Sequence, residues 1–372
     1  MPPSKKQKEP LKLKVNEVDI LLETESLKKY LKSRKREGIF SMNIQGNPGL
    51  TNTIPTIESF SNLVDFNCSQ NNLTNLSQIR LPENLLFFNC SLNKLRYLPS
   101  QFPKNLKEFE ASHNRLSSVP SLRNTQLTVC KFSHNQVEVL PELPVTLEEF
   151  NCSFNDIRTL SEIEHCRQLK DLDCSHNRLE ALPEELFRLP LVLLFCENNN
   201  LARLPAQMPP QLRHLICCSN RLKTLPPLKI QCPRMHSLSC RNNELTHLPS
   251  LPLPMERLRC GNNRLIMLPE IGEHVWILEI LGNPVCNFVP YMDYFLFNTV
   301  NGLSFRKSLK AFLKFKETFY FLLCKKKLLA WLWKIRDKIA RQRFHPSHLW
   351  KFVDTVDDFD NVSLHAWLDQ WQ

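Results

Sequence analysis

Hydrophobic and polar positions repeat along most of the chain with a period of 20 to 23 residues. From Leu63 to about Pro290 the pattern is LxxLxCxxNxLxxLP, and its asparagine marks each turn of the repeat. Repetition at so constant a spacing indicates a solenoid, in which each repeat buries its apolar side chains against its neighbours. A less regular repeat, with Met42, Ile44 and Asn47 at the corresponding positions, precedes them. The repeat asparagines are Asn71, Asn93, Asn114, Asn135, Asn155, Asn177, Asn199, Asn220, Asn243, Asn263 and Asn283.

Each repeat predicts one short strand. In Leu147-x-x-Phe150-x-Cys152 the apolar residues alternate, which places them on one side of an extended segment. Strands of successive repeats would stack in parallel, about 4.8 Å apart. Proline after the last apolar position, as at Pro141 and Pro205, favours an extended return on the convex side. The pattern is that of a leucine-rich repeat, and it predicts an α/β repeat fold: a leucine-rich-repeat solenoid with a parallel β-strand arc, flanked by helices.

Eight cysteines occupy one position of the repeat, where Ala111, Phe132 and Ile280 stand in other repeats. Such a position requires an apolar side chain, and a free thiol packs as a small hydrophobe. The alternative is a ladder of disulfides or metal ligands, but the chain has no CxxC pair and parallel inward side chains fit disulfide geometry poorly. We therefore expect packing and no metal site. The eight are Cys68, Cys90, Cys152, Cys174, Cys196, Cys217, Cys240 and Cys260.

The cysteines also bear on the cellular compartment. Fourteen cysteines without a disulfide pattern indicate a reducing environment. The charged N-terminus is not followed by the apolar segment of a secretory signal. Glycans at the N-x-[ST] sequons of Asn67, Asn89 and Asn151 would block the inner face of the arc. We expect a cytoplasmic protein, in the host cytoplasm for an effector or viral protein, and the basic run from Lys28 to Arg36 leaves a nuclear location open.

Binding on such a scaffold normally uses the concave strand face, at the variable positions between the template residues. These positions are acidic in the middle repeats, basic in the late repeats and aromatic at Phe87 and Phe195. The alternative to a binding role is that these exposed strand positions are polar only because they face water. Reversal of Asp171 and Asp173 to lysine is expected to abolish binding of a basic partner. The predicted partner-binding residues are Phe87, Glu108, Glu110, Glu149, Asp171, Asp173, Phe195, His214, Ile216, Arg257 and Arg259.

Three histidines, His113, His134 and His176, share the position two residues after the inward strand residue. Stacked histidines can hold a metal, but Phe154 interrupts the row and other residue types occupy it elsewhere. We expect a consensus residue at the edge of the repeat rather than a metal ligand.

The net charge of +11 lies outside the repeats. Residues 39–304 carry a net charge of −1, whereas residues 1–38 carry +5 and residues 305–343 carry +11. The last 29 residues are acidic, with a net charge of −4. The predicted parts of the chain are a basic helical segment (1–38), the solenoid (39–290), a basic amphipathic helical segment (291–343) and an acidic tail (344–372).

Residues 305–343 combine basic residues with an apolar spine that includes Phe312, Leu323 and Trp331. Three interpretations stay open: a cap on the end of the solenoid, contact with an anionic membrane, or contact with nucleic-acid phosphates. Lys325-Lys326-Lys327 interrupts the apolar stretch, so it cannot span a bilayer.

Residues 63–290 resemble the repeats of secreted bacterial effectors of the YopM/IpaH type, with Leu-Pro pairs such as Leu140-Pro141 and Leu248-Pro249. Some of those effectors carry a ubiquitin-ligase domain with a Cys-x-Asp motif. No cysteine here has an aspartate two positions later, so the resemblance does not imply ligase activity. The stretch from Ile339 to Leu349, with the acidic residues after it, is similar to a short C-terminal motif of many large-DNA-virus proteins. Leucine-rich-repeat proteins are common among those as well.

The expected function is a non-catalytic interaction module, effector- or adaptor-like, that binds a host or cellular protein on the concave face. The chain has no phosphate-binding glycine loop, no GxSxG and no HExxH, so we expect no catalytic residues, no cofactor and no small-molecule substrate. One alternative is a membrane- or nucleic-acid-associated scaffold that uses the basic C-terminal helices. The other is an enzyme of unknown class.

Overall fold

The structure, a computed structural model, describes residues 11–15, 18–22 and 38–285, without residues 48, 53, 55, 56 and 273. The chain divides into two units, Met1–Asp293 and Tyr294–Gln372. All described residues belong to the first unit, so the expectations for residues 291–343 and for the acidic tail lie outside them. Within this described part, no helix has the length and apolar character needed to cross a membrane.

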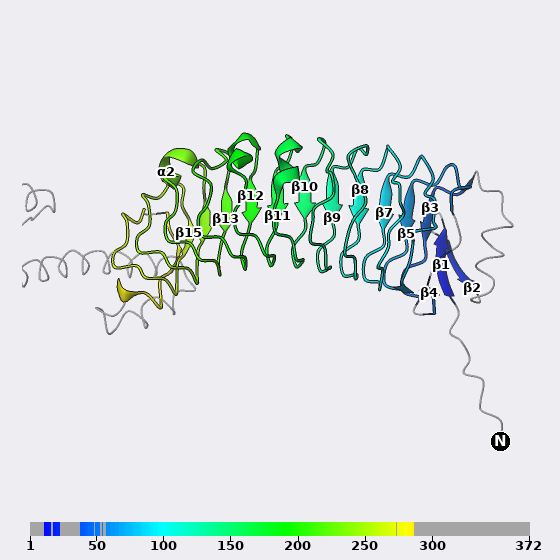
Figure 1. Cartoon of the computed structure of the whole chain (residues 1–372), viewed down its shortest axis with the longest axis horizontal. Coiled ribbons are helices and arrows are strands. Elements are labelled where there is room, and N and C mark those ends of the chain that lie inside the picture. The colour runs from blue at the N-terminus through cyan, green and yellow to red at the C-terminus, as the bar shows by residue number, and fades with distance from the viewer. Residues whose placement is uncertain are drawn as a thin grey trace, which may run out of the picture. The chain divides into compact units, whose positions relative to one another are not determined.

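A 14-stranded sheet runs through the described part of the first unit (Figure 1). Three-residue strands, one per repeat, pair in parallel with the strands of the neighbouring repeats. The predicted leucine-rich-repeat solenoid is therefore confirmed. These strands are β3 (Ser41–Asn43), β5 (Asp65–Asn67), β7 (Phe87–Asn89), β8 (Glu108–Glu110), β9 (Val129–Lys131), β10 (Glu149–Asn151), β11 (Asp171–Asp173), β12 (Leu193–Phe195), β13 (His214–Ile216), β14 (Ser237–Ser239), β15 (Arg257–Arg259) and β16 (Ile277–Glu279).

The return segments between these strands contain little regular structure. Short helical turns are η2 (Ser161–His165), η3 (Glu184–Arg188) and α2 (Leu228–Gln231), and a separate small sheet pairs β4 (Thr51–Asn52) with β6 (Asn72–Leu73). A proline often follows the last buried leucine of a repeat and cannot donate a ladder hydrogen bond, which disfavours a strand there.

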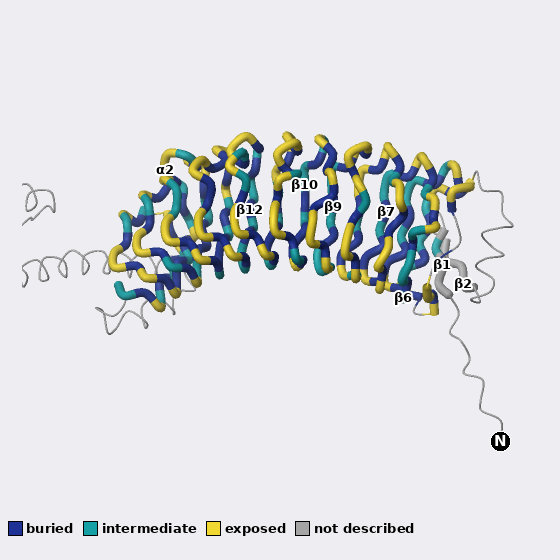
Figure 2. The backbone as a smooth tube through the Cα atoms, viewed as in Figure 1, coloured by how far each residue is buried: buried dark blue, intermediate teal, exposed yellow. Residues whose placement is uncertain are grey.

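The core lies between the strands and the return segments (Figure 2). The middle residue of every three-residue strand is buried, and its two neighbours are mostly half-buried. Phe66, Phe88 and Phe109 stack in successive strands, with ring centroids 5.9 Å apart. The eight cysteines of the repeat position are buried and free, as the packing interpretation expects. Burial raises the pKa of the Cys152 and Cys174 thiols, so both are protonated and unreactive.

The N-terminal segment differs from its prediction. The expectation that residues 1–38 are helical is wrong at β1 (Leu11–Val15) and β2 (Val18–Leu22), which form an antiparallel pair. Leu11, Leu13 and Val15 alternate with lysines, the period of a strand, whereas the prediction weighed the basic composition instead. Strand β1 also pairs antiparallel with β3 and so occupies the edge that the first repeat would otherwise expose.

A buried or half-buried asparagine side chain links each repeat to the one before it. The Asn199 Nδ2 group donates to the carbonyl oxygens of Cys174 at 3.0 Å and Cys196 at 3.2 Å, and its Oδ1 accepts the N–H of Leu179 at 3.0 Å. The same pattern recurs along the solenoid, for example at Asn93 and at Asn263. It satisfies backbone groups that the three-residue strands leave unpaired.

The residue before each of these asparagines adopts a left-handed backbone conformation. Its φ lies between 51° and 56° in the ten repeats where it is not glycine, and Gly282 has a φ of 74°. Its N–H donates to a carbonyl of the next repeat, as His113 does to Ser133 at 2.8 Å. The three histidines noted in the sequence occupy this position. The residues at this position share a backbone conformation and not a side-chain chemistry, so leucine and phenylalanine stand in the same row as the histidines.

The asparagine bridges predict a stability difference between two adjacent residues. Asn199→Ala is expected to lower the free energy of unfolding by about 3 kcal/mol, because it removes four hydrogen bonds and leaves the buried Leu179 N–H unpaired. Asn200→Ala is the control, because Asn200 is exposed. Urea denaturation followed by circular dichroism measures both variants, and equal losses would contradict the prediction.

Candidate functional site

The first and third residues of the three-residue strands β3, β5 and β7 to β16 form one surface, which we call the strand face. All eleven predicted partner-binding residues lie at these positions, from Phe87 in β7 to Arg259 in β15. Glu108 and Arg257 are exposed and the other nine are half-buried. The structure therefore places the predicted residues on one surface but spreads them over seven strands between β7 and β15.

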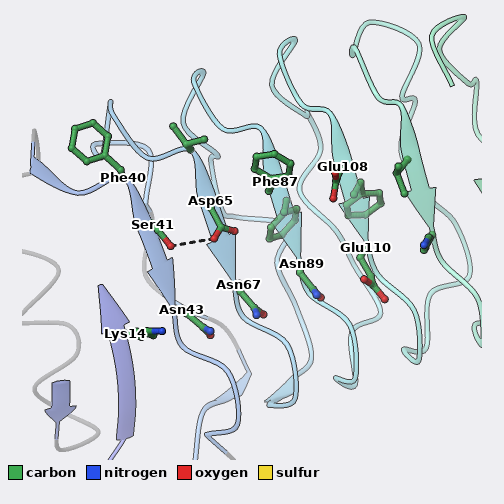
Figure 3. Close-up of a pocket in the computed structure, with 15 residues that line it drawn as sticks. Lys14, Phe40, Ser41, Asn43, Asp65, Asn67, Phe87, Asn89, Glu108 and Glu110 are labelled. Atoms are coloured by element: carbon green, nitrogen blue, oxygen red, sulfur yellow. Dashed lines mark hydrogen bonds between the residues drawn. The ribbon is translucent and has the colours of Figure 1, made fainter. Parts of the chain in front are cut away.

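A depression of about 750 Å³ lies on the strand face over strands β3, β5, β7, β8 and β9 (Figure 3). Of the eleven predicted residues, Phe87, Glu108 and Glu110 line it. Phe40, which comes directly before β3, also lines it and is 55% exposed. The depression thus combines aromatic and acidic side chains.

Three asparagines at the ends of neighbouring strands, Asn43, Asn67 and Asn89, line the same depression. The Oδ1 atom of each accepts the backbone N–H two residues later, at 2.9 Å in all three cases. Because Oδ1 accepts this bond, Nδ2 is the atom of each amide that remains to bind a ligand. Within the described residues, the Nδ2 groups of Asn43 and Asn89 donate no hydrogen bond, so both can donate to an incoming carbonyl or carboxylate.

A second hydrogen bond to the same Oδ1 atom accounts for the serine of the N-x-S sequences in the repeats. The Ser91 hydroxyl and the Ser153 hydroxyl donate to Oδ1 of Asn89 and of Asn151, each at 2.7 Å. The serine therefore closes the end of the strand in these repeats, which is a structural reason for the motif.

The acidic residues of the depression differ in how they are paired. The Ser41 hydroxyl donates to Asp65 Oδ2 at 3.1 Å, which partly satisfies that carboxylate (Figure 3). Neither Glu108 nor Glu110 forms an ion pair with any described residue. These two carboxylates are therefore the ones available to a basic group.

The middle of the strand face is less acidic than its sequence indicates. Lys131 Nζ lies 2.6 Å from a Glu149 carboxylate oxygen, so that charge is offset. Burial first and then Glu149 raise the pKa of Asp171, while Lys170 opposes them. Asp173 Oδ1 accepts the Ser175 N–H at 3.1 Å and the Ser175 hydroxyl at 2.6 Å. Reversing Asp173 would therefore break the strand end as well as change the surface charge.

The late strands carry the predicted basic residues. His214, Ser237 and Arg257 lie opposite one another on β13, β14 and β15. Arg241 pairs with Glu279, which offsets its charge. Arg257 lies over the Trp276 ring, 5.0 Å from its centroid. Ile216 and Arg259 occupy the third positions of β13 and β15.

Twelve of the fifteen residues that line the depression were absent from the predicted site, among them Lys14, Phe40, Ser41 and Asn43. The irregular repeat with Met42 inward carried the signal for Ser41 and Asn43, because its neighbours in a strand must point to the other face. Lys14 reaches the site through the β1–β3 pairing, which the repeat pattern does not contain.

The histidine row forms a continuous aromatic stack. Ring centroids lie 4.1 Å apart between His113 and His134, 4.0 Å between His134 and Phe154, and 3.8 Å between Phe154 and His176. Phe154 therefore continues the row rather than interrupting it. No group of three or more metal-ligating side chains occurs in the part of the chain that the structure describes.

Comparison with known proteins agrees with this geometry. The family model for leucine-rich repeats (two copies) matches residues 210–252. The leucine-rich effector YopM from Yersinia pestis is 26% identical, with a TM-score of 0.54 over 70% of this chain and 81% of that one. The chain has the leucine-rich-repeat solenoid fold and is similar to YopM in structure. A search of curated proteins found no match.

A plant protein shows the same fold. The leucine-rich-repeat ectodomain of the Arabidopsis thaliana receptor kinase GASSHO1/SCHENGEN3, in complex with CASPARIAN STRIP INTEGRITY FACTOR 2, is 21% identical with a TM-score of 0.54. The match covers 66% of this chain and 36% of that one. At this identity the likeness shows the fold alone.

The aromatic stack predicts a pH-dependent stability. Burial first, and then His113 and His176, lower the pKa of His134 below its ordinary value of 6.5. The unfolded chain therefore takes up the proton first, so stability falls as the pH drops below about 6.5. His134→Phe keeps the stack and removes this proton, so it is expected to lose less stability than the unsubstituted protein between pH 7.5 and pH 5.

Thermal unfolding at the two pH values measures this difference. His247→Phe, an exposed site outside the stack, is the control and is expected to keep the original pH dependence. If the His134→Phe and His247→Phe variants shift alike with pH, the His134 assignment is wrong.

Proposed function

We propose that this protein is a non-catalytic module that binds another protein along the strand face, in the manner of an effector or adaptor. The observation that carries the proposal is the depression over β3, β5, β7, β8 and β9, with its half-buried Phe87, its exposed Phe40 and two carboxylates that form no ion pair with a described residue. Aromatic side chains in a shaped surface are typical anchors of protein interfaces, and charges around them orient the partner.

The chemistry of the depression indicates the kind of partner segment. Glu108 and Glu110 would pair with a lysine or arginine of the partner. The free Nδ2 groups of Asn43 and Asn89 would donate to carbonyl oxygens of its backbone, and Phe87 would cover an apolar side chain. A basic peptide segment or loop of a folded protein supplies all three groups. Because the strands form a preformed sheet, we expect little rearrangement of the module on binding.

The other expected features stay proposals. The buried free thiols support a reducing, cytoplasmic location. Contact of residues 305–343 with an anionic membrane or with nucleic acid concerns residues that the structure does not describe. The concave position of the strand face likewise rests on the sequence pattern of the solenoid.

A photocrosslinking experiment tests the position of the binding surface. Benzoylphenylalanine replaces Phe87 in the tagged full-length protein, and Ile230, which is 81% exposed on α2, is the control position. Illumination in host-type cells is expected to crosslink a discrete protein to position 87 and not to position 230. Absence of any crosslink at position 87, or the same products at both positions, would overturn the proposed function.

The acidic residues give a second prediction, measured with the crosslinked partner. Glu108→Lys together with Glu110→Lys is expected to weaken partner binding at least tenfold, because it places like charges against the basic segment. These residues are better suited than Asp171 and Asp173, since Asp173 also closes a strand end. Isothermal titration calorimetry measures the affinity.

The matched control makes the same change in net charge elsewhere. Glu138 and Glu180 are exposed and lie outside the strand face, and Glu138→Lys with Glu180→Lys is expected to leave the affinity within twofold. Equal weakening in the two double variants would mean that net charge, rather than the depression, determines binding.

A further inference from the structure

A second, smaller cavity lies on the strand face over β13, β14 and β15, far along the sheet from the depression described above. Its volume is about 180 Å³, and it exists because the small Ser237 lies between His214 and Arg257 in register. The residues directly before these strands complete its lining. The full lining is Arg213, His214, His236, Ser237, Glu256 and Arg257.

The charge of this cavity is predominantly positive. Neither Arg213 nor Arg257 forms an ion pair with a residue that the structure describes. Glu256 is the one carboxylate among the lining residues, so two guanidinium groups and two imidazoles face a single acid. Arg257 also lies over the Trp276 ring, which limits the directions its guanidinium can take.

A buried hydrogen-bonding atom in the lining lacks a partner. The Nδ1 atom of His236 is buried and forms no hydrogen bond. A buried polar atom without a partner lowers the stability of the fold, and a hydrogen bond from an incoming polar group can remove that cost. An unsatisfied polar group in the lining of a basic cavity favours a hydrogen-bonding anion over an apolar ligand.

The electrostatics of His214 agree with this assignment. Burial first, and then Arg257 and His236, lower the pKa of His214, with a smaller contribution from Arg213 and opposition from Glu256. A negative charge placed in the cavity would relieve the repulsion among these groups.

We propose that this cavity binds a carboxylate from an acidic segment of the protein partner, with Arg213 and Arg257 on the anion and His236 as a hydrogen-bonding group. The proposal rests on the proposed function, since it assigns a second contact to the same partner. Its distance along the sheet from Glu108 and Glu110 means that the partner carries basic and acidic segments in a fixed order.

The layout of charge favours a protein over a nucleic acid. A nucleic acid requires a continuous basic track that follows its phosphates. On the strand face the unpaired arginines are confined to these strands, with Asp173 on one side and Glu279 on the other. A single cavity of about 180 Å³ fits an acidic side chain better than a phosphate backbone.

The test uses the full-length protein labelled with 5-fluorotryptophan and a blocked decapeptide of glutamate as the probe. The fluorine resonance of Trp276, identified by its loss in Trp276→Phe, reports on the cavity through the contact with Arg257. This local signal separates binding in the cavity from binding to the basic residues 305–343. We expect the Trp276 resonance to shift saturably as the peptide is added.

Two single charge reversals in one repeat complete the test. Arg213→Glu is expected to weaken the peptide at least tenfold, whereas Arg221→Glu, at an exposed position outside the strand face, is expected to change the affinity less than twofold. Equal weakening by both variants, or no shift of Trp276, would overturn the proposal. So would a twelve-nucleotide RNA that shifts Trp276 at lower concentrations than the peptide.

The two proposals fail separately. Loss of the crosslink at position 87, with the peptide response intact, would remove the proposed function and leave the carboxylate site. A specific crosslink at position 87 without any peptide response at Trp276 would remove the carboxylate site alone.

Discussion

The hydrogen bonds of the repeat asparagine are the interaction on which the rest of this structure depends. Where the chain leaves a three-residue strand, its backbone N–H and C=O groups lose their partners in the sheet. Burying such groups without a hydrogen bond destabilises the fold. One amide satisfies carbonyls of its own repeat and of the preceding repeat, and accepts an N–H from that preceding repeat. Each turn is therefore completed by its neighbour, which is why a single repeat has no stable fold of its own.

The parts of this fold that burial determines could be predicted from the sequence. Leu147, Phe150 and Cys152 are buried because the apolar pattern of the repeat places them on the inner side of the chain. The strand at Glu149–Asn151 follows from this pattern. The N-terminal hairpin could not be found in this way, because it lies outside the repeat and its lysines suggested a basic helix. Its alternation of Leu11, Leu13 and Val15 was a local signal that composition obscured.

The candidate site was predictable only in position. The register places Glu149 on the strand face, but its ion pair with Lys131 depends on side-chain conformations in two repeats. The small cavity beside Arg257 depends on Ser237 being small, which is a property of the neighbouring strand. The inward residues of a solenoid are constrained by the fold, whereas the outward ones are free to vary. The function of the outward residues therefore has to be inferred from which of them lie side by side on neighbouring strands.

The left-handed residue before each asparagine has a consequence for how this protein tolerates substitution. Side chains branched at Cβ fit that conformation poorly, whereas asparagine, histidine and glycine accept it more readily. In the eleven repeats the row contains glutamine, leucine, histidine, phenylalanine, asparagine, serine and glycine, but no valine, isoleucine or threonine. One edge of the solenoid can therefore change its chemistry almost completely in evolution, on the condition that β-branched residues stay out of it.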